Sequence, residues 1–246
     1  MKKIIFLSTF ALFVLGACKK QTTNTGDQKA ALTITYNNSC DGKPVEYGKL
    51  QYTNAAGNLY SITMLKYYIS NVVLVHEDNT EHKLQNYDLM DAFDLANFST
   101  IEAKDVPYGK YTKMKFYVGI DKVRNHSGAQ DGDLDPIHQM IWTWATGYIF
   151  SKHEGTFVNN IGDTVVMQYH MGTNNALADI EIPINLTVDK ATKKMSILFD
   201  LNKMYNSPVI DFNTKAIRHS TSSDDIPWIA DMVANAADAF VFQSQD

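Results

Sequence analysis

The chain has 246 residues, with 22 basic and 27 acidic side chains that give a formal net charge of −5. This acidic balance argues against nucleic acid binding, which requires a basic surface. Hydrophobic residues make up 45% of the chain, which is enough for a buried core, and the length fits one domain behind a short leader.

The N-terminus has the three parts of a bacterial lipoprotein signal. Lys2 and Lys3 precede an apolar run over residues 4–15, and small residues lead directly to Cys18. The run is shorter than the roughly 20 apolar residues that span a membrane, so a transmembrane helix is the weaker interpretation. We expect residues 1–17 to be removed and the new N-terminal cysteine to be lipidated. Lipidation would anchor the protein in the bacterial cell envelope, at its periplasmic or outer-membrane face.

Cleavage leaves 20 basic and 27 acidic residues, a formal charge of −7. Residues 18–30 are polar, which is typical of a flexible tether, and residues 31–246 are expected to form one domain. Once Cys18 is lipidated, Cys40 is the only cysteine that remains, so an internal disulfide is excluded. A single cysteine makes no metal-binding spacing motif, and we expect Cys40 to be inert.

Alternation of apolar and polar residues predicts an all-β fold. The clearest run is 178–188, which is typical of a strand with one buried face. Pro183 cannot donate a ladder hydrogen bond, so we expect an edge strand or a bulge there. A turn-like segment at 189–192 predicts that residues 195–201 form the hairpin partner of this strand. Further strands are predicted at 32–36, 48–53, 59–64, 67–76, 82–91, 110–119, 148–152 and 164–171.

Strands of this number predict an immunoglobulin-like β-sandwich that carries a C-terminal helix. Apolar residues at helical spacing over 226–240 indicate the helix, with Asp224 or Asp225 as N-cap and Pro227 in the first turn. We also expect a short helix at 136–144.

The stretch 119–155 separates two predicted strands and holds the chain's most unusual residues. Connections in compact domains are usually about four to six residues long, and one near thirty is normally functional or disordered. Its aromatic and apolar residues argue against disorder. We interpret it as a long ordered loop with a function, in which His126, Trp142 and Trp144 are the residues to explain.

Three carboxylates in this loop, Asp131, Asp133 and Asp135, alternate as in a calcium loop. The EF-hand pattern then fails, because its sixth and twelfth positions require Gly and Glu and are occupied here by Pro136 and Trp142. We favour a solvated acidic turn, with a calcium site of another kind as the alternative.

The sequence contains no motif of a known enzyme class. It has no G-x-S-x-G elbow, no Walker loop and no H-E-x-x-H pair among its seven histidines, so we predict a protein that is not an enzyme. A metal site is better supported, because imidazole suits copper and a few converging histidines suffice. His126 in the loop, His170 at a strand end and His219 before the terminal helix lie where sites occur on rigid β scaffolds.

Several separated segments, in a fixed order over most of the mature chain, carry a family resemblance. They are YISNVVL (68–74), GID (119–121), NH (125–126), DPI (135–137), MIWTW (140–144), GY (147–148), EG (154–155), YHMG (169–172), HS (219–220) and the terminal helix. Together they resemble the MbnP-like family of copper-binding periplasmic proteins and lipoproteins, which is related to the copper proteins MopE and CorA.

The resemblance implies a β-sandwich-like domain that binds copper, as Cu(I) or Cu(II), through histidines. In some members a tryptophan is oxidised to kynurenine by a partner di-haem protein of the MbnH type, and the new amine ligates Cu(I). On matching positions, His126, His170 and His219 become the candidate copper ligands, and Trp142 or Trp144 the candidate for oxidation. The histidines outside the family motifs are expected to be structural: His76, His82, His138 and His153.

We therefore expect an envelope lipoprotein that captures copper and stores or delivers it. The alternative is a non-enzymatic surface lipoprotein that binds a glycan or a protein partner through exposed aromatic residues near Trp142 and Trp144. A structural subunit of an envelope assembly is a third possibility.

Overall fold

The computed structural model describes residues 28–126, 128–143, 145–191 and 194–245. The predicted signal peptide, Cys18, most of the predicted tether and Trp144 lie outside the described residues. Within these residues, no helix is long and apolar enough to cross a membrane.

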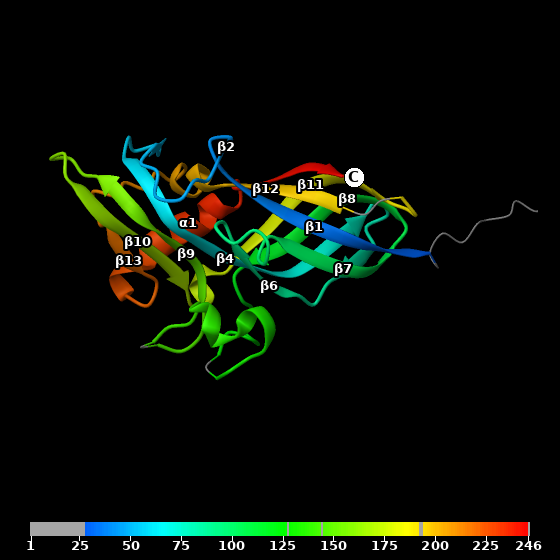
Figure 1. The fold of residues 1–246 in the computed structure, drawn as a ribbon. Coiled ribbons are helices and arrows are strands. Elements are labelled where there is room, and N and C mark those ends of the chain that lie inside the picture. The colour runs from blue at the N-terminus through cyan, green and yellow to red at the C-terminus, as the bar shows by residue number, and fades with distance from the viewer. Residues whose placement is uncertain (1–27, 127, 144, 192–193, 246) are drawn as a thin grey trace, which may run out of the picture.

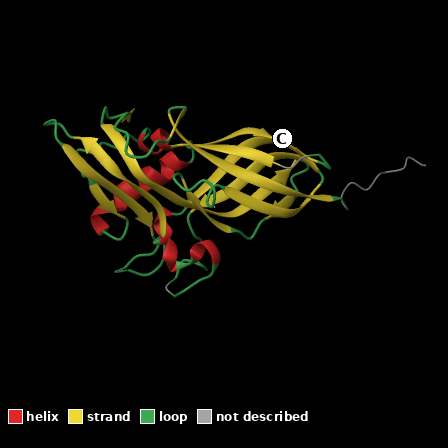
Figure 2. Cartoon of the chain, in the orientation of Figure 1, coloured by secondary structure: helices red, strands yellow, loops and turns green. Residues whose placement is uncertain are grey.

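Two β-sheets form the body of the molecule (Figures 1 and 2). The smaller sheet has the order β14 (Phe240–Gln245), β12 (Lys194–Asp200), β1 (Lys29–Cys40) and β2 (Lys43–Pro44), with β7 (Thr100–Pro107) also paired to β1. The larger sheet has the order β11 (Ala178–Val188), β8 (Gly109–Val118), β4 (Leu59–His76), β9 (Ile149–Val158), β10 (Thr164–Gly172) and β13 (Ile217–His219). Three short strands also pair with β4: β3 (Tyr52–Thr53), β5 (Glu81–Lys83) and β6 (Tyr87–Asp91).

Helical segments gather on the half of the molecule that contains β9 and β10 (Figure 2). They include the helix α1 (Ile226–Ala236) and the 3-10 turns η5 (Leu201–Tyr205) and η6 (Ser223–Asp225). The expected all-β sandwich with a C-terminal helix is confirmed.

β4 is shared by both halves of the larger sheet. One of its edges pairs with β3, β6 and β5, while the other pairs first with β9 and then with β8. β8 ends with Val118 opposite Ile69, and β9 places Ser151 opposite Tyr67, so the two strands lie end to end along one edge. The residues between β8 and β9 have no place in the sheet, and they protrude as the long green loop below β4 and β9 in Figure 1.

The strand 178–188 has the predicted alternation of buried and exposed residues, and its register shifts after Pro183. Its predicted hairpin partner is wrong. β12 pairs in parallel with β1 and antiparallel with β14, whereas β11 pairs with β8 in the other sheet. The buried faces of β11 and β12 reach the same core from opposite sheets, which a turn signal alone does not distinguish from a hairpin.

Other predicted elements differ in their extent. The predicted strands at 59–64 and 67–76 are one continuous strand, and the strand predicted at 82–91 is divided between β5 and β6. The terminal helix ends at Ala236, and Phe240 begins β14 instead. The short helix predicted at 136–144 is only the 3-10 turn Pro136–His138.

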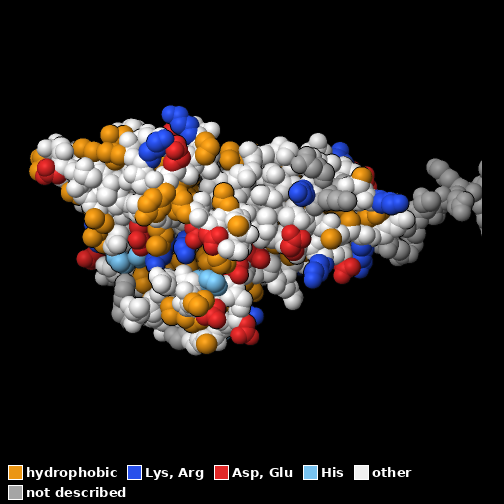
Figure 3. All heavy atoms as spheres, viewed as in Figure 1, with side chains coloured by type: hydrophobic (Ala, Val, Ile, Leu, Met, Phe, Trp, Pro, Cys, Tyr) orange, Lys and Arg blue, Asp and Glu red, His pale blue; other side chains and the backbone are white. Residues whose placement is uncertain are grey.

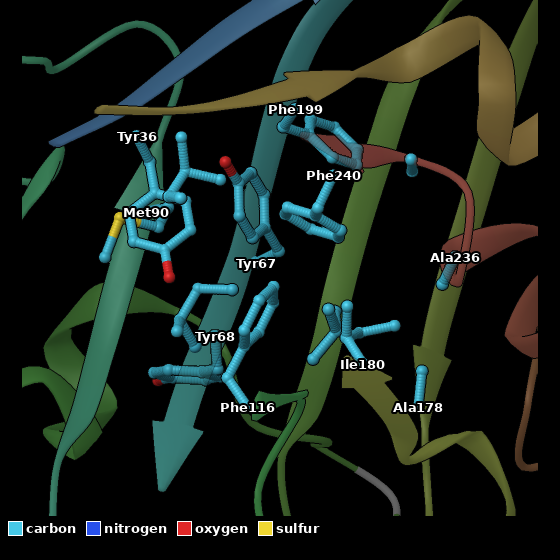
Figure 4. Close-up of a cluster of buried hydrophobic side chains, with 14 of the residues drawn as sticks. Tyr36, Tyr67, Tyr68, Met90, Phe116, Ala178, Ile180, Phe199, Ala236 and Phe240 are labelled. Carbon is cyan, nitrogen blue, oxygen red and sulfur yellow. The ribbon is translucent and has the colours of Figure 1, made fainter. Parts of the chain in front are cut away.

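An aromatic cluster joins the two sheets (Figure 4). Phe199 of β12 lies against Tyr67 of β4, with ring centroids 4.8 Å apart, and Phe240 of β14 lies edge-on to Phe116 of β8 at 5.1 Å. Tyr36 of β1 also packs edge-on against Phe116. Full burial of each such ring stabilises the fold by about 1.5–3 kcal/mol, so these contacts fix the stacking of the sheets.

A second aromatic core covers the inner face of β9 and β10. Tyr169 of β10 packs against Phe212 and against Trp228 of α1, with ring centroids 5.5 and 5.3 Å apart. His153 belongs to this core, since its Nε2 lies 2.7 Å from Ser151 Oγ and its Nδ1 2.8 Å from the Tyr205 hydroxyl. Burial, reinforced by His170, lowers the pKa of His153 to about 3, so this imidazole is neutral.

Asp88 of β6 is partly buried near the long loop. Burial raises the pKa of its carboxyl to about 6, an effect that a hydrogen bond from Asn86 opposes and the Asp133 carboxylate reinforces. A carboxyl whose pKa is higher in the folded state stabilises the fold at low pH. That contribution is lost as the pH rises from about 4, the pKa of an aspartate in an unfolded chain, to about 6, the pKa of Asp88 in the folded protein.

We predict that Asp88→Asn removes this loss. The variant should match the wild type near pH 4 and be more stable by about 1–2 kcal/mol at pH 7, because the amide never ionises. Urea unfolding between pH 4 and pH 7 measures the difference. Asp179→Asn, at an exposed position of β11, is the matched control and should show no growing advantage. A gain of equal size at both pH values would contradict the assignment.

Candidate metal centre

His170 and His219 form a cross-strand pair. β10 and β13 are parallel neighbours whose register places these residues side by side, and Ser220 N donates a hydrogen bond to His170 O at 3.1 Å. The imidazole centroids are 5.0 Å apart. Because side chains alternate along a strand, His170 lies on the outer face of the sheet, opposite to Tyr169 in the inner core.

Trp142, from the long loop, covers both imidazoles. Its ring centroid lies 6.4 Å from that of His170 and 6.3 Å from that of His219, and the residue is only 4% exposed. Gly172 at the end of β10 permits this approach. A Cβ at that position would lie 2.8 Å from the indole and 2.4 Å from Tyr148 O. Trp142 can therefore pack against the end of β10 only because residue 172 is a glycine.

Glu154 of β9 contacts the His170 ring. Its Oε1 lies 2.7 Å from His170 Nε2, and this hydrogen bond lowers the pKa of the Glu154 carboxyl although burial opposes the shift. The other ring nitrogen, Nδ1, is buried and has no hydrogen-bond partner among the described residues. A buried acceptor without a partner costs about 1–3 kcal/mol, so this atom is available to a ligand.

The surroundings of the second imidazole, His219, favour its neutral form, and a hydrogen bond holds its backbone. Burial, and next the neighbouring His170, lower the pKa of His219, and neutral imidazole is the form that binds metals. The buried carboxylate of Asp225 accepts a hydrogen bond from His219 N at 3.2 Å. The Lys215 ammonium donates to both of its oxygens at 2.8 and 2.9 Å. Asp225 therefore ties the end of β13, where His219 lies, to the turn that precedes α1.

His126 approaches from the loop. It is exposed, and together with Trp142 it lines a hollow of about 280 Å³. The preceding residue anchors this segment, because Asn125 Oδ1 accepts from Tyr148 N at 2.9 Å and its Nδ2 donates to Asn174 Oδ1 at 3.0 Å. Figure 3 shows histidine side chains at the surface on the side of the molecule that carries the long loop.

The structure thus brings together three of the predicted site residues, His170, His219 and Trp142. His126 shares a hollow with Trp142, and Trp144 lies outside the described residues. In the described part of the chain, no group of three or more His, Cys, Asp or Glu side chains is arranged to hold a metal ion. The two imidazoles are a pair of donors, and a third donor would come from a different residue type or from a movement of the loop.

The acidic turn of the loop binds backbone amides. Asp133 Oδ2 accepts from Leu89 N at 2.7 Å, and Asp135 Oδ1 accepts from Ile137 N at 2.8 Å. The Tyr68 hydroxyl donates to Asp133 O at 2.9 Å. The contacts with Leu89 and Tyr68 attach the loop to β6 and β4, whereas the Asp135 contact lies within the loop. The turn therefore has a structural role in which one carboxylate oxygen each of Asp133 and Asp135 accepts a hydrogen bond.

The remaining histidines lie in other surroundings. His76 packs on Tyr111 and His138 on Phe98, with ring centroids 5.3 and 5.1 Å apart, while His82 lies on β5. None of these contacts involves the pair on β10 and β13.

Cys40 is buried at the end of β1, with its Sγ 3.2 Å from the Tyr60 hydroxyl. Burial raises the pKa of the thiol to about 12. The thiolate, which is the form that ligates metals, is therefore suppressed at neutral pH.

Three contributors were not predicted from the sequence: Glu154, Gly172 and Asp225. A signal for Glu154 exists, because the hairpin of β9 and β10 places it diagonally across from His170 on one face. Gly172 acts through its contact with Trp142 of the long loop, and Asp225, which was expected only as an N-cap, binds His219 N and Lys215 instead; no local pattern indicates either role.

Residues 29–223 match the family model of MbnP. The structure is similar to that of MbnP from Methylosinus trichosporium, with a TM-score of 0.53 and 18% sequence identity over 76% of this chain and 80% of that chain. At this identity the likeness shows the fold alone. A comparison with curated protein sequences finds no match.

We predict that Gly172→Ala displaces Trp142 from the imidazole pair. The new Cβ would collide with the indole and with Tyr148 O, so the loop has to shift at a cost of about 1–3 kcal/mol. Tryptophan emission and urea unfolding measure both effects. Gly57→Ala is the control: nothing lies within 4 Å, and its backbone φ of +82° costs stability without altering emission. Unchanged emission in Gly172→Ala would contradict the close packing.

Proposed function

Because this chain belongs to the MbnP family, we propose that it is an envelope lipoprotein that binds copper and stores or delivers it without catalytic turnover. Family and fold are compatible with a copper-related role. The observation that carries the finer proposal is the pair of His170 and His219, whose rings lie side by side beneath Trp142 with a buried, unpartnered Nδ1 on His170.

The donor set fits copper. Imidazole nitrogens suit copper, zinc, iron and nickel, whereas magnesium and calcium require oxygen ligands. A metal–imidazole bond is about 2 Å long, so two imidazoles on one ion bring their donor nitrogens within about 4 Å. Ring centroids 5.0 Å apart are compatible with that requirement. The cover of Trp142 limits competition from water, and His126 is the candidate third histidine from the loop.

Oxidation of a tryptophan would add another donor. Conversion of an indole to kynurenine is a four-electron oxidation that breaks the C2–C3 bond, takes up oxygen from water and releases C2 as formate, which leaves an aromatic amine. We propose that a di-haem partner of the MbnH type accepts the electrons. The contacts of Trp142 with both imidazoles support this residue as the position, while Trp144 lies outside the described residues.

Binding of a glycan or a protein through exposed aromatics is less well supported. Sugar stacking requires an accessible ring face, and Trp142 is 4% exposed. The lipid anchor at Cys18 is retained in the proposal on the basis of the lipoprotein signal in the sequence.

We predict that His170→Ala and His219→Ala each weaken copper binding by at least about tenfold, because each removes one of a few metal ligands. His126→Ala should have a smaller effect, since the exposed loop residue is not in the pair. Competition with a chromogenic Cu(I) chelator, on the mature lipoprotein in detergent, measures the affinity. His138→Ala is the control, because His138 packs on Phe98 and not on the pair of His170 and His219. A doubly substituted His170→Ala, His219→Ala protein that binds copper like the wild type would refute the site.

We predict that protein purified from its own host carries one kynurenine. Intact mass should show the small characteristic increase, and tandem mass spectrometry should place it at Trp142. Trp142→Phe should then abolish the increase, whereas Trp228→Phe, in the inner core, should leave it. Unmodified wild-type protein from the host would contradict the proposal that Trp142 is oxidised. Copper binding by the histidines would still be decided by the histidine substitutions described above.

A further inference from the structure

The contact between Glu154 and His170 is built into the register of the hairpin. β9 and β10 pair Glu154 with Gln168 and Lys152 with His170, so Glu154 lies diagonally across from His170 on the same face. The 2.7 Å contact joins Glu154 Oε1 to Nε2 of the ring. The neighbouring Lys152 Nζ donates to Gln139 O of the loop at 3.0 Å, and among the described residues no hydrogen bond joins it to the Glu154 carboxylate.

This contact decides which nitrogen of a neutral imidazole carries the proton. An ionised carboxylate only accepts hydrogen bonds, so the nitrogen that faces it has to be N–H. For His170 that nitrogen is Nε2, and Nδ1 keeps its lone pair. Nδ1 is also the atom that is buried without a hydrogen-bond partner among the described residues. The nitrogen that the Glu154 contact leaves unprotonated is therefore also the one that no other described residue occupies.

We propose that Glu154 is a positioning residue, which holds His170 as the Nε2–H tautomer and makes Nδ1 the atom that binds the metal. The metal-binding half of this inference rests on the copper function proposed above, whereas the tautomer is a property of the chain alone. Metal-binding histidines commonly donate their second N–H to a carboxylate, which fixes the ring and raises its basicity, and loss of that partner costs about 10–100-fold in affinity.

The tautomer can be read without copper. Long-range proton–nitrogen spectra of the ¹⁵N-histidine-labelled mature lipoprotein at pH 8 should show His170 with a protonated Nε2 and a bare Nδ1, assigned by the signals missing in His170→Ala. In Glu154→Ala the two tautomers should become mixed. Glu154→Gln should retain part of the preference, because its amide oxygen still accepts from Nε2–H. Glu181→Ala, at an exposed glutamate of β11 paired with Lys113, should match the wild type.

The copper affinity of the same variants tests whether Nδ1 of His170 is the atom that binds the metal. Glu154→Ala should bind copper about 10–100-fold more weakly than the wild type, Glu154→Gln should lose less, and Glu181→Ala should lose nothing. If Glu154→Ala does not fold, Glu154→Asp replaces it, because aspartate keeps the charge but withdraws the carboxylate by one methylene.

Two results would overturn the proposal. One is a wild-type His170 protonated at Nδ1, either alone or together with Nε2. The other is a Glu154→Ala protein that retains both the tautomer and the copper affinity. Failure of the wild type to bind copper would instead refute the proposed function, and the tautomer comparison would still decide whether Glu154 positions His170.

Discussion

The shared edge of β4 is the constraint from which the candidate site follows. Since β8 and β9 occupy that edge end to end, the chain leaves the sheet after Val118 and rejoins it at Ile149. The residues between them have to lie outside the sheet. The inner face of β9 and β10 is already filled by the aromatic core under α1, so the loop covers the outer face, where His170 and His219 lie.

The loop is attached to the sheet at several points, which makes it a fixed cover. At its start, Asp121 accepts hydrogen bonds from Asn71 Nδ2 at 2.7 Å and from the Tyr87 hydroxyl. Burial alone would raise the pKa of Asp121, but these bonds outweigh it and the pKa is lowered. Further along, Asp133 binds Leu89 N. A net contribution of about 0.5–1.5 kcal/mol for each such bond means that together they can hold Trp142 over the imidazoles.

The periodicity of the sequence predicted those strands whose position depends on the residues of the strand itself. The alternation at 178–188 identified β11, because a strand with one buried face necessarily has period two. The candidate residues His170 and His219 were first indicated by their expected places at a strand end and before the terminal helix, and the family resemblance then made them candidate copper ligands. Their adjacency comes from parallel pairing between β10 and a strand of three residues, which has no periodicity to detect. The burial of Trp142 depends on Gly172, a contact between segments far apart in the sequence.

Two carboxylates hold the imidazole pair in place through hydrogen bonds. Glu154 binds the ring of His170, while Asp225 binds the backbone of His219 and the Lys215 ammonium. Oε1 of Glu154 and both oxygens of Asp225 are therefore engaged in hydrogen bonds and ion pairs, and a hard cation that requires several free oxygen ligands would first have to break these contacts. Imidazole nitrogen remains as the available donor, which favours a borderline or soft metal over calcium or magnesium. The selectivity of the proposed metal site would then depend on how its acidic residues are already occupied, as well as on the histidines themselves.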